Sequence, residues 1–172
     1  LFEQTDDYWS NQWALTLASE QISSEADIDN HLIYLVPSWK LNYYSVPDPF
    51  AAQDGWRWQN EIRFGAEQLS NPNLSFIQIE QRAKYIWAFQ PEWRLMARTQ
   101  VAFTKMDTEE FNNSMPISYR YFAGGDISVR GYPYQYLSPK DDNGISLGGK
   151  HLLVSSIEMD WQFIPDWRVA IF

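Results

Sequence analysis

One arginine and two carboxylates could form an internal ion pair. Arg130 lies within the glycine-rich segment 124–132, and Glu158 and Asp160 are two positions apart in a later segment of alternating polarity. Glycines let a loop approach a wall closely, and side chains two positions apart in a strand point to the same side. A guanidinium can bind a carboxylate through two parallel hydrogen bonds. We therefore expect Arg130 to pair with Glu158 or Asp160; a solvated loop arginine is the simpler alternative.

Other chemistry has little support in the sequence. The chain has no Cys, which excludes a thiolate nucleophile, a disulfide and a Cys-based zinc site. His31 and His151 lie in different segments without a Glu-His motif, and the acidic runs 25–29, 107–110 and 141–142 lack the spacing of a calcium loop. The net charge of −9 argues against nucleic acid as a partner. We predict no enzymatic activity, no cofactor and no metal site.

Apolar and polar residues alternate along most of the chain, which indicates β-strands. The alternation predicts strands at residues 9–20, 33–43, 56–67, 76–89, 93–104 and 150–163, with a seventh beginning at Trp167. It also predicts one apolar, outward-facing stripe, which contains Trp58, Ile62, Ile79, Ala83, Leu95, Val101, Ile157 and Trp161. Glu158 and Asp160 fall on the opposite, polar side.

Strand length and composition favour a membrane β-barrel. The chain is 45% apolar, yet its mean hydropathy is −0.44, and no stretch approaches the roughly 18 apolar residues of a membrane helix. The predicted strands are about twice the roughly 5–6 residues common in soluble sheets, and their polar faces carry both signs of charge, as a water-filled lumen would. Aromatic residues make up 17% of the chain, with nine Trp, which suits an interfacial belt. A large soluble β-sheet protein remains the alternative, because its strands also alternate.

The connections between strands fall into two kinds. Three contain proline and have aromatic neighbours, at residues 46–49, 90–91 and 164–166. They are alternate connections, so an up-and-down sheet puts them at one end with a girdle of rings. The others are residues 21–29, 69–73 and the long connection 107–149. Outer-membrane barrels have short periplasmic turns and longer extracellular loops, so 107–149 is expected outside, as a functional loop that folds back and packs.

Within that loop, the segment Phe122–Tyr132 resembles the signature loop of the BamA/TamA superfamily of outer-membrane assembly barrels. Residues 137–144 and 148–154 resemble the TamA branch, and Pro47–Gly55 followed by Trp56 resembles the family's periplasmic turn. The motif positions matched by the resemblance are Gly124, Gly125, Val129, Arg130, Gly131 and Tyr132. The resemblance implies that the loop enters the lumen and that its arginine meets an acid on the following strand, where Ser156-Ile157-Glu158 matches. Glu158 is therefore the first choice as the partner of Arg130, and Asp160 is the second.

The resemblance also implies an architecture. It predicts an all-β, antiparallel, up-and-down transmembrane barrel of 16 strands that follows periplasmic POTRA domains. Residues 1–172 would be the middle part of that C-terminal barrel domain, a fragment of about seven strands.

Three functions follow from these expectations. The first is an outer-membrane assembly factor, which is in contact with lipid, helps to insert client barrels such as autotransporters, and works with an inner-membrane partner similar to TamB. The second is a two-partner-type secretion pore of the same superfamily. The third is a soluble β-rich carbohydrate-binding domain whose Trp residues stack on sugars.

Overall fold

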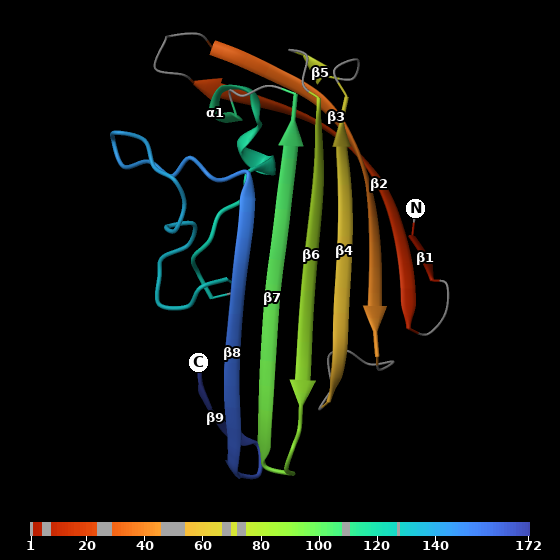
Figure 1. Ribbon diagram of the computed structural model, residues 1–172, viewed down its shortest axis with the longest axis vertical. Helices are drawn as coiled ribbons and strands as arrows, with labels where there is room; N and C mark the ends of the chain where they lie inside the picture. The colour runs from red at the N-terminus through yellow and green to blue at the C-terminus, as the bar shows by residue number, and fades with distance from the viewer. Residues whose placement is uncertain are drawn as a thin grey trace.

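The chain forms one antiparallel sheet in which neighbours in sequence are neighbours in space (Figure 1). The computed structural model describes residues 2–4, 8–23, 29–45, 54–66, 70–71, 75–107, 111–126 and 128–172. The strands are β1 (Phe2–Gln4), β2 (Trp9–Ser23), β3 (Asp29–Tyr44), β4 (Gly55–Gly65), β5 (Ser70–Asn71), β6 (Phe76–Trp87), β7 (Trp93–Met106), β8 (His151–Ile164) and β9 (Trp167–Ile171). Their order is β1-β2-β3-β4-β6-β7-β8-β9, and the short β5 pairs with β3. A helical turn, α1 (Phe111–Ser114), and a 3-10 turn, Ile117–Tyr119, follow β7.

All seven predicted strands are present, which confirms the all-β, up-and-down fold. The largest shift in a boundary is at the start of β3, which pairs with β2 from Asp29 onward, opposite Ser23. The sequence did not predict β1, β5 or α1, because each is too short to show a period. The proline turn at 46–49 and the acidic residues 25–28 and 108–110 lie outside the described residues.

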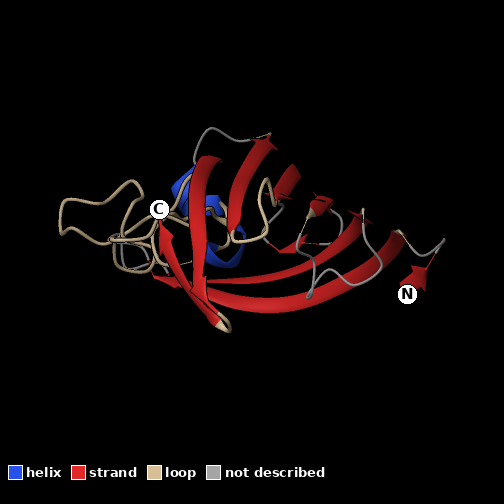
Figure 2. Cartoon of the chain, turned by 90° about the horizontal axis from the view of Figure 1, so that it is seen from below, coloured by secondary structure: helices blue, strands red, loops and turns tan. Residues whose placement is uncertain are grey.

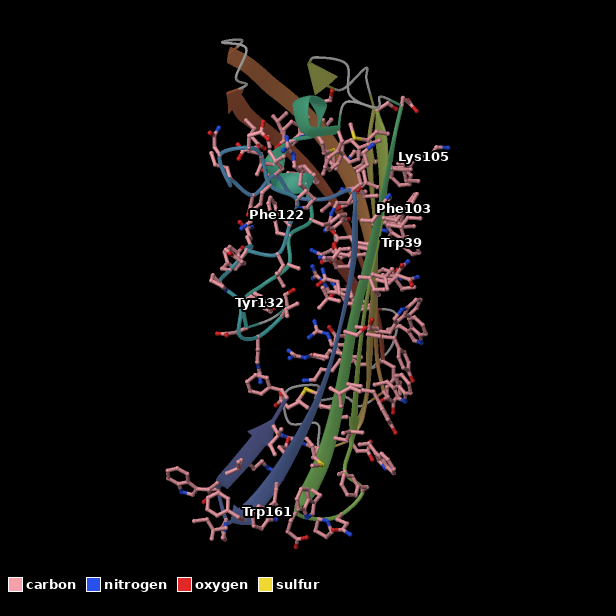
Figure 3. All side chains as sticks on the ribbon, turned by 60° about the vertical axis from the view of Figure 1, so that its left-hand side comes forward. Trp39, Phe103, Lys105, Phe122, Tyr132 and Trp161 are labelled. Carbon is pink, nitrogen blue, oxygen red and sulfur yellow. The ribbon has the colours of Figure 1, made fainter. Side chains whose placement is uncertain are left out.

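The strand register separates the sheet into two faces of different chemistry. Trp58 is opposite Ala83, and Ile62 is opposite Ile79, so the predicted apolar stripe is continuous from strand to strand. The whole predicted stripe lies on the face that points away from the loop (Figure 3). We call the other face, on the side of the loop (Figure 2), the inner wall. By the strand register it carries the side chains in phase with Glu80, Arg98, Glu158 and Asp160.

Aromatic side chains on the outer face form two groups rather than one. At one end, Trp93 stacks on Trp161 with ring centroids 5.6 Å apart. Toward the loop end, Phe103 stacks on His151 at 4.6 Å (Figure 3). The expectation of a single girdle was therefore incomplete. Phe103 lies ten positions after Trp93 in β7, and at about 3.3 Å per position this distance is close to the roughly 30 Å of a bilayer core.

The apolar core lies on the inner wall, beneath α1. Tyr34, Val36 and Phe76 from the sheet pack against Phe111 and Met115 from the start of the loop. Because apolar surface is buried there, the first turn of the loop is fixed to the sheet by the hydrophobic effect. Among the described residues, no helix is long and apolar enough to cross a membrane.

Candidate functional site: a loop held against the inner wall

The segment between β7 and β8 is a folded unit rather than a structureless connection. After α1 and the 3-10 turn, antiparallel bridges join Tyr121 to Gly149 and Ala123 to Leu137. In the first of these bridges, Tyr121 N donates to Gly149 O at 3.0 Å and Gly149 N donates to Tyr121 O at 2.8 Å. The loop therefore satisfies its own backbone groups while it lies against the inner wall (Figure 2).

The motif residues 124–132 close the tip of this loop. The backbone N–H of Gly125 donates to Tyr132 O at 3.0 Å, and the N–H of Ser128 donates to Gly125 O at 3.0 Å. Gly124 N donates to the Ser128 hydroxyl at 3.3 Å. Tyr132 itself is half exposed. The tip is thus a small ring of hydrogen bonds that presents Val129 and Arg130 on one turn.

Glycine is required at Gly124 for two reasons. Its φ is +109°, a conformation that side chains rarely adopt, and a Cβ there would lie 2.4 Å from the carbonyl oxygen of Pro133. Gly131 also has a positive φ, +88°, but a Cβ would meet nothing within 4 Å. At Gly124, both the close approach of another backbone segment and the positive φ disfavour a side chain. At Gly131, only the positive φ does so.

The structure places Arg130 against Glu158 of β8. Arg130 Nη1 lies 2.8 Å from Glu158 Oε2. The Arg130 guanidinium also lies over the ring of Phe172, 4.4 Å from its centroid. The Glu158 side chain is only 12% exposed and that of Arg130 is 31% exposed, so the pair is partly removed from water. The contact joins the loop tip to the inner wall.

Asp160, the second choice, has other partners. It is 3% exposed and lies opposite Arg94 in the β7–β8 pairing. Arg94 Nη2 is 2.8 Å from its Oδ2, and Arg168 of β9 binds its other oxygen. Asp160 therefore ties three strands together and does not bind Arg130.

Three anchors at the base of the loop were not predicted from the sequence. Glu20 of β2 accepts from the backbone N–H of Ile117 at 2.7 Å and from the Ser118 hydroxyl at 2.7 Å. Gln78 of β6, which is 1% exposed, donates to Tyr119 O at 2.7 Å. Arg120 donates to two backbone carbonyls within the loop itself, at 2.8 and 3.0 Å. Glu20 and Gln78 reach residues 97 and 41 positions away, and pairing over such distances leaves no local signal in a sequence.

The space between loop and wall is polar and ordered by ion pairs. A cavity of about 760 Å³ there is lined by Arg63, Glu80 and Tyr121, among others. Arg63 bridges Glu61 and Glu80 at 2.9 and 3.2 Å. Burial raises the pKa of the Tyr121 phenol to about 12, and the Glu80 carboxylate adds to the rise. The phenol therefore stays neutral at physiological pH.

The acidic pair at 141–142 has a local role. One oxygen of Asp141 accepts from the backbone N–H groups of Asn143 and Ile145, at 3.0 and 2.7 Å. This is the arrangement of an aspartate-stabilised turn. His151 contacts the ring of Phe103, and the side chain of His31 lies outside the described residues.

The comparisons with known proteins agree with this geometry. Residues 2–172 match the family described as the Omp85 superfamily domain. Over 64 residues the chain is 33% identical to the outer membrane protein assembly factor BamA of Nitratidesulfovibrio vulgaris, a match that covers 37% of this chain and 8% of that protein. The crystal structure of BamA from Haemophilus ducreyi lacking POTRA domains 1-3 superposes with a TM-score of 0.80. That match has 14% identity and covers 98% of this chain and 38% of that chain, so it shows a shared fold.

Proposed function

Because the chain belongs to the Omp85 superfamily, whose relatives lie in the bacterial outer membrane, we propose that it is part of a machine that inserts or secretes other β-barrel proteins. The chain spans 8% of the curated relative and 38% of the solved one, so the activity concerns a longer protein. Within that protein, residues 1–172 form the middle part of one C-terminal barrel domain, and their apolar outer face contacts lipid.

One observation carries the proposal: a motif loop is held inside the concave sheet by Arg130 and Glu158. A passive pore needs an open passage along its inner wall. A loop that closes on itself and binds the wall at its base and its tip instead occupies that space and braces neighbouring strands. An assembly factor must keep its own barrel intact while client strands form beside it, and an internal brace serves that need.

The finer assignment is to the TamA branch, with autotransporter-like barrels as clients and an inner-membrane partner similar to TamB. Its support is the likeness of residues 137–144 and 148–154 to that branch. The soluble carbohydrate-binding alternative is set aside, because the stacked Trp rings lie on the outer face of a sheet of an outer-membrane family.

Reconstitution of the full-length protein in lipid vesicles tests the proposal. Vesicles with the wild-type protein should accelerate insertion of an unfolded autotransporter barrel, scored by protease protection and heat-modifiable migration. Arg130→Ala should reduce the rate, whereas Lys140→Ala, which removes a cation elsewhere in the same loop, should not. Release of a soluble exoprotein across the membrane without barrel insertion would instead support the two-partner secretion pore and contradict the proposal.

A further inference from the structure

Three cations lie side by side on the inner wall. The register places Arg57 of β4 opposite Lys84 of β6, and Lys84 opposite Arg98 of β7. Like charges directly opposite in a sheet repel and destabilise it. A protein with a net charge of −9 has many acids that could form ion pairs with such a row, so the lack of such a pair among the described residues requires an explanation.

The nearby carboxylates are already bound to other cations. The ion pairs of the inner wall join Glu61 to Lys40 and Arg63, Glu80 to Arg63 and Arg82, Glu158 to Arg130, and Asp160 to Arg94 and Arg168. Within the described part of the chain, no carboxylate forms an ion pair with Arg57, Lys84 or Arg98. The guanidinium of Arg57 contacts the Tyr44 ring instead.

A small cavity opens onto this row beneath the loop tip. It has a volume of about 110 Å³ and is lined by Lys84 and Arg98, with hydroxyls from Ser128 of the loop and Ser156 of β8. Arg98 Nε donates to the Ser156 hydroxyl at 3.3 Å, and its two terminal nitrogens have no hydrogen-bond partner among the described residues. Ser128 Oγ accepts from Gly124 N, so its own proton remains available to donate.

We propose that this cavity is a binding site for a phosphate group. Its donors are an ammonium, a guanidinium fork and two hydroxyls, a set that suits a multiply charged tetrahedral anion. A bound phosphate would neutralise the row and connect β6, β7 and β8 to Ser128 at the loop tip. The site does not depend on the assembly function, because its donors and its charge are independent of what the machine transports.

Thermal unfolding of the full-length protein in detergent tests the site, with inorganic phosphate as the probe and sodium chloride to hold the ionic strength constant. Phosphate should raise the unfolding midpoint in a saturable way. Lys84→Gln and Arg98→Gln should each weaken phosphate affinity by about tenfold, as expected for one charge-assisted hydrogen bond. Without phosphate, the same variants should unfold at a higher temperature than wild type, because repulsion is relieved. Variants that are more stable than wild type without phosphate but gain less stability from phosphate indicate a ligand site rather than a structural role for these two residues.

Lys105→Gln is the matched control, since it removes one charge from the exposed outer end of β7 and should leave the phosphate response unchanged. Glycerol phosphate and a short-chain phosphatidic acid distinguish the sources: tighter binding of the acylated compound identifies a lipid headgroup, and equal binding identifies a free phosphate compound. The proposal is overturned if phosphate has no effect beyond that of chloride, or if the two variants respond as wild type does.

Discussion

Replacing Arg130 with alanine removes the contact that ties the loop tip to the inner wall. The lost contacts are the 2.8 Å hydrogen bond to Glu158 and the cation–π contact with Phe172 at 4.4 Å. A hydrogen bond to a charged group contributes about 1.5–3 kcal/mol, and a partly exposed cation–π contact about 0.5–1 kcal/mol. The Arg130 side chain is 31% exposed, so solvent screening favours the lower end of that range. We expect the docked loop to lose about 2 kcal/mol, roughly thirty-fold in its docking equilibrium.

Hydrogen exchange of the full-length protein in detergent measures this loss directly. The amides of Gly125 and Ser128 are bonded within the tip, so they exchange when the tip opens. Peptides that cover residues 121–132 should exchange about thirty-fold faster in Arg130→Ala, while peptides from β7 should not change. Lys140→Ala, whose cation lies over the Tyr136 ring at 3.6 Å, should leave exchange at the tip as it is in wild type.

A double-mutant cycle with Glu158→Gln then isolates the pair. If Arg130 acts through Glu158, the double variant should be destabilised by about 1–2 kcal/mol less than the sum of the two single variants. Additivity to within about 0.5 kcal/mol would refute the reasoning, because it would mean that each side chain stabilises the tip through other partners. Unchanged exchange in Arg130→Ala would refute it as well.

Three further changes test the loop backbone, the orientation of the sheet and the buried phenol. Gly124→Ala should weaken loop docking by about 1–3 kcal/mol, measured as faster proteolysis of the loop. Gly131→Ala should have a smaller effect, because Gly131 has a positive φ but open space around it. Equal effects would contradict the contact between Gly124 and the Pro133 carbonyl as the reason for glycine. Val101→Arg on the outer face should lower the free energy of unfolding in lipid vesicles by about 2–4 kcal/mol. Gln100→Arg should be tolerated, because Gln100 points at the inner-wall carboxylate of Glu80. Equal losses of stability in urea unfolding would contradict this assignment of the two faces. Burial raises the pKa of Tyr121 from 10.0 to about 12, so the neutral phenol contributes fully to loop docking below pH 10, and this contribution is lost as the pH rises toward 12. Proteolysis of the loop should therefore accelerate between pH 10 and 12, and Tyr121→Phe should remove this pH dependence.

The strands and their two faces could be predicted because a period of two is a local property. Every residue of the predicted stripe, from Trp58 to Trp161, lies on the outer face of the sheet, as the alternation predicts. The same alternation placed Glu158 inward, and the glycines and the family resemblance indicated that Arg130 could reach it. The sequence and the structure therefore bring together the same two residues at the loop tip.

The base of the loop could not be predicted, because its contacts depend on register across the whole sheet. Glu20 meets Ile117 only because β2 and β3 pair along their full length and bend over the loop. Asp160 is a different case. Its partner Arg94 lies directly opposite in the pairing of β7 with β8, and drawing the register of these neighbouring strands would have found it.

The Glu20 contact sets an order of events during folding. It joins positions 97 residues apart, and the entropy of closing so long a segment is lost before the contact contributes any stability. The pairings of β2 with β3, β4 with β6 and β6 with β7 close over far shorter separations, so we expect the loop to dock after those strands have paired. Contacts made after the transition state slow unfolding more than they speed folding. The loop therefore affects mainly the unfolding rate of the finished sheet, whereas pairing of the strands determines the folding rate of the sheet.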